Sequence, residues 1–361
     1  MPVALRSSWV AVFAFLTGCE STRVTNAPNA ALECTIPMEL IADGGPGKDG
    51  IPALTNPRLV DPVDPTASYL LDHDRVIGLV VDGQAIAVPL NIGWWHEIVN
   101  LNIAEHRLAV THCPLTGSSL VFDRGAAANA TFGVSGLLYM NNLIMYDRAT
   151  GESSLWPQML RGARCGVAAD QNLTSFPSVE MTWAGWRALQ PNTKVVSSET
   201  GHLREYRAYP YGSYDQPENG SLLFPMPSVD GRRPPKERVL GIPRDPDGGI
   251  ALPYGELEKR GAVAAVEVTG GATRQVVFWD GASQLAAAFV ASTGAEGLSF
   301  RVADGQIVDA ETGSVWRGDG LSTAGPLAGT QLEPVAQAFV AYWFAWAAFY
   351  PEAALWTAGA P

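Results

Sequence analysis

The chain has 361 residues, a formal net charge of −12 at pH 7 and a sequence pI of about 4.9. Phosphate binding needs clustered Lys and Arg, so this charge argues against nucleic acid as a partner and against electrostatic binding to anionic lipid headgroups. Hydrophobic residues make up 47% of the chain and charged residues 17%, which is typical of a packed globular protein.

The N-terminus is organised like a lipoprotein signal peptide. The apolar stretch 9–16 is too short to cross a bilayer as a mature helix. Leu16-Thr17-Gly18-Cys19 follows it and resembles a bacterial lipobox, in which diacylglycerol is attached to the cysteine before cleavage. We therefore expect residues 1–18 to be removed and Cys19 to anchor the protein in the cell envelope, outside the cytoplasm. The alternative is an ordinary signal peptide with a chance cysteine.

A polar stretch at 20–30 indicates a tether between the lipid and the fold, and we assign residues 19–43 to it. The first element expected after the tether is a β-hairpin. Apolar residues alternate in 76–81 and 85–90, on either side of the turn signal Asp82-Gly83. Further strands are expected at 108–111, 119–122, 131–134 and 143–146.

Two helices with paired tryptophans are predicted further along. The first carries Trp183 and Trp186 and stops before Pro191. The segment 208–235 is rich in Pro, Gly, Tyr and Asp and reads as a linker or a long surface loop. The second helix, at 335–350, is almost entirely apolar but shorter than the ~20 residues of a membrane span, so we expect it to be buried.

The same landmarks occur twice in the same order, at offsets of 160 to 163 residues. They begin in the first copy at Arg75, Asp147 and Trp183, and in the second at Arg238, Asp309 and Trp343. We predict a strand-rich, mostly antiparallel α+β fold with two tandem pseudo-repeats, each ending in a Trp-x-x-Trp helix. The first repeat covers 44–207, and a degenerate second repeat covers 236–361.

Polar groups found in the first copy alone are the candidate functional residues, because a requirement of the fold should appear in both copies. They lie in two segments, 94–100 and 111–118, which hold His96, Glu97, His112 and Cys113. Cys113 precedes a proline and is expected at a strand end or turn, where a thiol can be a nucleophile, a redox centre or a ligand of a soft metal. The alternative is a small buried cysteine beside hydrogen-bonded histidines.

With Cys19 lipidated, three cysteines remain in an oxidising compartment, which is an odd number. If Cys113 belongs to the site, Cys34 and Cys165 are the pair left to form a disulfide.

Two segments resemble a zinc protease motif and a dinucleotide-binding motif, but neither meets the requirements of its motif. His96-Glu97-Ile98-Val99-Asn100 has an asparagine where a zinc protease helix needs its second histidine. The glycines between Gly45 and Gly50 have dinucleotide spacing, but Pro46 and Pro52 leave no helix N-terminus there to receive a phosphate.

Six ordered blocks resemble the domain-of-unknown-function family numbered 3179, over about residues 44–200 and faintly in the second copy. The blocks are 44–54, 95–100, 111–115, 122–124, 132–137 and 145–148. The family usually has a second cysteine in its Cys-Pro-Leu-Cys-Gly loop, and Thr116 stands there in this chain. A two-cysteine cycle within the loop is therefore impossible, and any chemistry of the loop rests on Cys113 alone or with His96.

Three functions follow as hypotheses. The first is an envelope protein that binds a small ligand or a soft metal, with copper(I) best suited to thiolate, imidazole and thioether donors. Its metal ligands would be drawn from Cys113, His96, His112, Met140 and Met145, with Asp49, Glu97 and Asp147 as supporting groups. The second is an enzyme with Cys113 as nucleophile and His96 as base. The third is a non-catalytic scaffold or interaction module. The first two require His96 and Cys113 to converge in one pocket.

Overall fold

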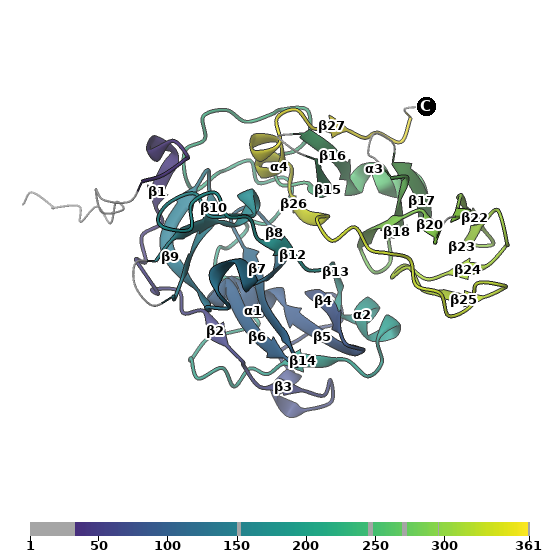
Figure 1. The fold of residues 1–361 in the computed structure, drawn as a ribbon, viewed down its shortest axis with the longest axis horizontal. Helices are drawn as coiled ribbons and strands as arrows, with labels where there is room; N and C mark the ends of the chain where they lie inside the picture. Colours follow the sequence, from purple (N-terminus) through teal and green to yellow (C-terminus); the bar gives the residue numbers. More distant parts are fainter. Residues whose placement is uncertain (1–32, 150–152, 245–247, 269–272, 295, 360–361) are drawn as a thin grey trace, which may run out of the picture.

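The computed structural model describes residues 33–149, 153–244, 248–268, 273–294 and 296–359 (Figure 1). The expected signal peptide and Cys19 lie outside the described residues. No helix in the described part of the chain is long and apolar enough to cross a membrane. The fold is strand-rich with mostly antiparallel sheets and a few short helices, as predicted.

Two sheets belong to the first half of the chain. A four-stranded sheet has the order β1-β9-β10-β11, formed by Ile41–Asp43, Phe132–Tyr139, Asn142–Asp147 and Leu155–Pro157. A five-stranded sheet has the order β13-β4-β5-β14-β3, formed by Val179–Thr182, Arg75–Val81, Gln84–Pro89, Lys194–Val196 and Leu59–Val60. Helix α1 (Leu90–His96) follows β5, and α2 (Trp183–Leu189) follows β13. Short 3-10 helices lie at Met38–Leu40, Pro65–Ala67, Gly125–Ala127 and Gln158–Leu160.

The second half contributes smaller sheets. Three strands, β17-β18-β19, are formed by Val263–Val268, Gln275–Asp280 and Leu285–Val290. Four strands, β22-β23-β24-β25, are formed by Phe300–Ala303, Gln306–Asp309, Val315–Trp316 and Ser322–Ala324, and the pair β20-β21 by Ser292–Thr293 and Glu296–Gly297. The helices of this half are α3 (Tyr254–Glu258) and α4 (Trp343–Phe349).

A nine-stranded sheet joins the two halves. Its order is β2-β6-β7-β8-β26-β15-β16-β27, with β12 paired to β8. The strands are Leu54–Thr55, Ile98–Ile103, His106–Cys113, Ser118–Asp123, Phe339–Tyr342, Arg238–Arg244, Gly248–Pro253, Ala354–Leu355 and, for β12, Thr174–Ser175. The halves meet where Val340 of β26 pairs with Ser119 of β8. Residues on either side of the expected 208–235 boundary therefore share one sheet.

The predicted hairpin is confirmed in β4 and β5. The strands pair antiparallel from Val76↔Pro89 to Val81↔Gln84. Asp82 and Gly83 both have positive φ, 48° and 81°, as a two-residue type I′ turn requires. The strands expected in the segment 108–146 lie in β7, β8, β9 and β10.

The helix expected at 335–350 is wrong in its first half. Residues Phe339–Tyr342 form strand β26, and helix α4 contains only Trp343–Phe349. The run is apolar throughout because β26 is buried between β8 and β15 in the joint sheet, and a strand buried on both faces shows no alternation. The expected burial is confirmed, since Trp343 and Trp346 are at most 1% exposed.

The C-terminal end of the expected tether is also wrong. Residues Ile41–Asp43 form β1, which pairs antiparallel with β9. Cys34 is disulfide-bonded to Cys165, as expected if Cys113 stays free. The local sequence does not predict this end of the tether, because the partners of β1 and of Cys34 lie about a hundred residues or more further along the chain.

The segment 208–235 lies in a long loop without helix or strand, between β14 and β15. The loop packs onto the first half: Tyr214 is 3% exposed and donates its hydroxyl to the Leu115 carbonyl at 3.0 Å. At its end, Lys236 is fully buried and donates to the carbonyls of Asn219 and Ser221. It is a packed surface segment that covers part of the fold.

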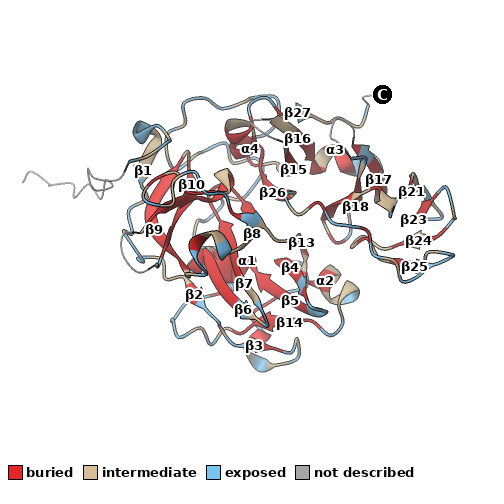
Figure 2. Cartoon of the chain, in the orientation of Figure 1, coloured by how far each residue is buried: buried red, intermediate tan, exposed pale blue. Residues whose placement is uncertain are grey.

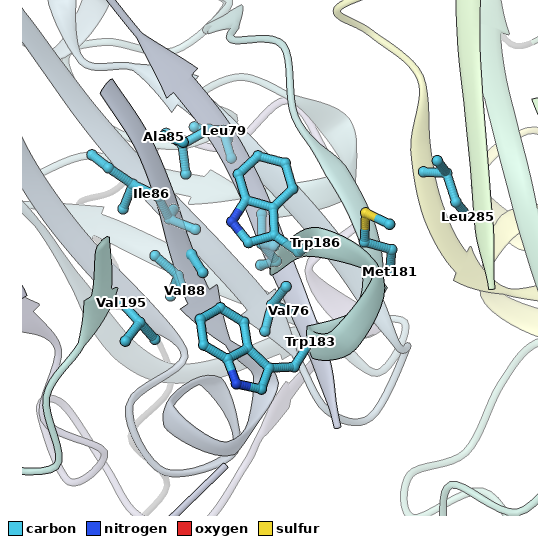
Figure 3. Close-up of a cluster of buried hydrophobic side chains, with 14 of the residues drawn as sticks. Val76, Leu79, Ala85, Ile86, Val88, Met181, Trp183, Trp186, Val195 and Leu285 are labelled. Carbon is cyan, nitrogen blue, oxygen red and sulfur yellow. The ribbon is translucent and has the colours of Figure 1, made fainter. Parts of the chain in front are cut away.

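Buried residues fill the sheets of both halves (Figure 2). In Figure 3 the indoles of Trp183 and Trp186 lie against β4 and β5, close to Val76 and Val88. The same cluster includes Leu285 of β19, so the core of the first half continues into the second. Burial of two tryptophans of this size is a large share of the apolar contribution of α2.

Candidate functional site

His96 ends helix α1 and is fully buried. Its Nδ1 lies 2.7 Å from the Pro52 carbonyl and its Nε2 lies 2.8 Å from the Tyr206 hydroxyl. A carbonyl accepts only, so Nδ1 carries the proton and Nε2 accepts from Tyr206. Burial lowers the pKa of His96 to about 4. Both ring nitrogens are thus engaged, and the imidazole is neutral.

Cys113 is the last residue of β7, at the strand end that the sequence predicts, and it is fully buried. Its thiol donates to the Asn141 carbonyl, with Sγ at 3.6 Å from the oxygen. Burial, together with the charge of Glu97, raises the pKa of Cys113 to about 11. The thiol therefore stays protonated near neutral pH, which does not favour a nucleophile or a metal-binding thiolate.

The remaining expected metal ligands are dispersed. Met145 is fully buried in β10, and Met140 lies in the turn between β9 and β10. His112 faces a different cavity, described below. Among the residues that the structure describes, no group of three or more His, Cys, Asp or Glu could hold a metal ion. No hydrogen bond there joins His96 and Cys113, and their joint site stays a prediction.

Two of the expected supporting carboxylates have other partners. Asp147 accepts from the Trp156 indole at 2.8 Å and from the Ser154 backbone N–H at 3.1 Å, so it holds its own turn. Asp49 pairs with Arg148 at 2.7 Å and accepts from the Tyr146 hydroxyl.

Glu97 is the third of these carboxylates, and it is 5% exposed. Its side chain forms no hydrogen bond within the described part of the chain, and burial raises its pKa to about 8. Burial raises the pKa of Cys113 and of Tyr211, and the negative charge of Glu97 raises both further.

A polar cavity of about 210 Å³ lies where the two halves meet. The loop after Cys113 contributes Pro114 and Gly117 to its wall. Its charged and titratable lining residues are His73, Asp74, Arg75, His112, Glu180, Asp215 and Arg238. Its other large lining residues are Leu90, Trp94, Tyr209 and Tyr342. This cavity brings residues from seven separate stretches of the chain together, and it is the candidate site.

His112 is oriented by a relay of two hydrogen bonds. Ser119 donates its hydroxyl proton to Glu180 Oε2 at 2.5 Å, so its oxygen accepts from His112 Nδ1 at 3.1 Å. The imidazole is therefore the Nδ1-protonated tautomer, and Nε2 keeps its lone pair. Burial lowers the pKa of His112 to about 4, so the ring is a neutral acceptor near pH 7.

Two guanidinium groups flank Glu180. Arg75 Nε lies 2.6 Å from Glu180 Oε1, while Arg238 Nε lies 4.0 Å from the same oxygen. Burial alone would raise the pKa of Glu180, but the charges of Arg75 and Arg238 hold it below its ordinary value. Arg75 also donates to two backbone carbonyls, whereas Arg238 donates no hydrogen bond within the described residues. Arg238 thus keeps free donors, and its side chain is 26% exposed.

Aromatic rings form another part of the wall. Trp94 and Tyr209 meet edge to face, with ring centroids 5.0 Å apart. The guanidinium of Arg238 lies over the Tyr342 ring at 5.8 Å. The buried Tyr209 hydroxyl has no hydrogen-bond partner in the described structure.

Most of this site was not predicted from the sequence. His112 was expected as a metal ligand beside Cys113, and Arg75 and Arg238 served only as markers of the repeats. Glu180 carries no signal beyond being a charged residue in a short apolar strand. When the two repeats are aligned on Trp183 and Trp343, Glu180 of β13 corresponds to Val340 of β26. The charge at this position therefore occurs in the first copy alone.

The fold and the cavity define a strand-rich α+β protein with a polar pocket at the junction of its halves. The chain belongs to the family described as Protein of unknown function (DUF3179), whose model matches residues 48–353. The match runs through both halves, further than the resemblance over residues 44–200 implies. No curated protein and no solved structure matches the chain.

Proposed function

We propose that the protein is an envelope lipoprotein that binds a small ligand with an anionic group in the cavity between its halves. The observation that carries this proposal is the Arg238 guanidinium, which faces the cavity with free donors. Glu180 is already compensated by Arg75, so the charge of Arg238 remains available to a ligand.

His112 and the size of the cavity add to the case. The neutral Nε2 of His112 can accept a hydrogen bond from a ligand N–H or O–H group. A cavity of about 210 Å³ has room for a small ligand.

We further propose that the two halves arose by duplication. In each half a helix tryptophan packs over a strand glycine: Trp186 over Gly78, and Trp346 over Gly241. The Asp147–Trp156 hydrogen bond has the counterpart Asp309–Trp316 at 2.9 Å.

Contacts between the halves support the same proposal. Thr182 N–H donates to the Ser283 carbonyl, and Tyr342 N–H donates to the Thr116 carbonyl. Each bond runs from the residue before a Trp-x-x-Trp helix to the turn between two strands of the other half. Under this proposal Arg75 and Arg238 are equivalent residues of the two halves, and both line the cavity.

A charge-matched pair of variants tests ligand binding. Arg238→Gln removes the free guanidinium, and Arg301→Gln makes the same change at an exposed site on β22. We expect millimolar acetate or inorganic phosphate, at constant ionic strength, to raise the thermal midpoint of the wild type and of Arg301→Gln but not that of Arg238→Gln. Equal responses of all three proteins would refute an anion site at Arg238.

Membrane attachment is tested separately. Cys19→Ser should leave the precursor uncleaved by the lipoprotein peptidase and without lipid, as read by mass spectrometry of the membrane fraction. Normal maturation of this variant to a soluble form would contradict lipid anchoring.

A further inference from the structure

We propose that the ligand is a small zwitterion of the α-amino-acid type, with its carboxylate on Arg238 and its ammonium group on Asp215. This inference rests on the proposed function and adds the substrate class of the same cavity.

The cavity holds two opposite charges that do not neutralise each other. Arg238 and Asp215 both line the cavity, and within the described residues no ion pair of 4.0 Å or less joins them. Arg238 reaches only Glu180 at that distance, and Asp215 accepts one hydrogen bond, from its neighbour Gln216 at 2.9 Å. A ligand with both charges can bridge the gap that the two side chains leave.

The other acidic groups of the cavity already have partners. Glu180 is bound to Arg75 and Ser119. Asp74 accepts from the Leu71 backbone N–H at 2.8 Å and from the Asn91 amide at 3.3 Å. Asp215, in the long loop between β14 and β15, accepts only from Gln216 among the described residues, so its carboxylate keeps free acceptor positions. The nearby Lys236 ammonium donates to the carbonyls of Asn219 and Ser221 and forms no ion pair of 4.0 Å or less with Asp215 in the described structure.

The cavity also has an aromatic wall. Tyr209 and Tyr342 line the same cavity as Asp215. Burial raises the pKa of both hydroxyls, and the negative charge of Asp215 raises it further. An ammonium group beside aromatic rings gains cation–π attraction in addition to its ion pair.

The volume of the cavity suits a small amino acid. A cavity of about 210 Å³ has room for an amino acid with a short side chain, such as glycine, alanine or serine. His112 Nε2 can then accept from a ligand hydroxyl or ammonium group.

Calorimetric titration of the purified mature protein with three matched probes tests the inference. L-alanine carries both charges, propionate lacks the amine and ethylamine lacks the carboxylate. We expect alanine to bind at least about tenfold more tightly than propionate, and ethylamine to bind more weakly still. This comparison uses the wild type alone and does not depend on a variant that folds.

Variants then assign the two ends. Asp215→Asn should reduce alanine affinity to that of propionate and leave propionate binding unchanged, whereas Asp304→Asn, the same change at an exposed turn, should alter neither. Propionate binding as tight as alanine binding, or alanine affinity unchanged in Asp215→Asn, would overturn the zwitterion and leave anion binding standing. An absence of binding by alanine, propionate, acetate and phosphate would overturn both proposals.

Discussion

Glu97 combines an unusual backbone conformation with a buried acidic group. It follows α1 with φ 55° and ψ −34°, a region that side-chain-bearing residues rarely adopt and that costs of order 1–3 kcal/mol. Its backbone carbonyl accepts from His112 N–H at 2.8 Å, which fixes the turn against β7. The conformation therefore joins the end of α1 to the strand that carries His112 and Cys113.

The difference in the free energy of unfolding between the wild type and Glu97→Gln should depend on pH. The native pKa of Glu97, about 8, lies above its ordinary value of 4.5, so the folded state binds the proton more tightly than the unfolded chain. The stability of the wild type should therefore fall, relative to Glu97→Gln, by roughly 1.4 kcal/mol per pH unit between about pH 4.5 and pH 8, and the gap should level off above that range. Urea unfolding of both proteins across this window measures it.

The control is Glu105→Gln, which exchanges a glutamate at an exposed turn. A free-energy difference between Glu97→Gln and the wild type that does not change with pH would show that Glu97 is ionised in the native protein.

At the scale of elements, each Trp-x-x-Trp helix packs on a strand at a glycine. A Cβ at Gly78 would lie 2.4 Å from the Trp186 ring, and a Cβ at Gly241 would lie 2.0 Å from the Trp346 ring. Real Cβ contacts are not that short, so either the helix or the indole must move. The two glycines thus set how closely α2 approaches β4 and how closely α4 approaches β15.

Gly78→Ala and Gly241→Ala should each destabilise the protein by about 1–3 kcal/mol, because overpacking forces side chains off their preferred rotamers and shifts backbone. Gly220→Ala is the matched control, since a Cβ there would meet nothing within 4 Å. Chemical unfolding followed by tryptophan fluorescence reports both the free energy and any change in the indole environment. If either core variant is as stable as the control, the close approach of helix and strand is wrong.

At the scale of the whole molecule, the disulfide and the joint sheet close the chain in two places. Cys34 and Cys165 are 131 residues apart, and the bond holds the segment before β1 against the residues that follow β11. The pairing of β8 with β26 closes a much longer stretch and joins the two halves.

Replacing both bonded cysteines by serine should lower the free energy of unfolding, by up to about 5 kcal/mol in the chain-entropy model for a loop of this length. The comparison is urea unfolding of the wild type and of the double variant, both under oxidising conditions. The wild type after reduction is the control and should resemble the variant. An unchanged unfolding midpoint would mean that the bond does not form in the protein.

Local sequence determined the parts of the fold whose signals are local. The β4–β5 hairpin follows from alternating apolar residues around Asp82-Gly83, whose positive φ values suit that dipeptide. The position of Cys113 at a strand end follows from the proline after it. The Cys34–Cys165 bond was left by elimination once Cys113 was set aside.

Only the tertiary structure decided which polar groups meet. The sequence predicts His96 beside Cys113, which stays a prediction, and the hydrogen bonds of His96 to Pro52 and Tyr206 come from the tertiary structure. The cavity instead joins His112 with Glu180 and Arg238, whose strands are distant in sequence and are brought together by sheet pairing and packing. Strand β26 was missed for the same physical reason. A short apolar segment becomes a strand or a helix according to the partners that cover it, and those partners, β8 and β15, lie about a hundred or more residues away.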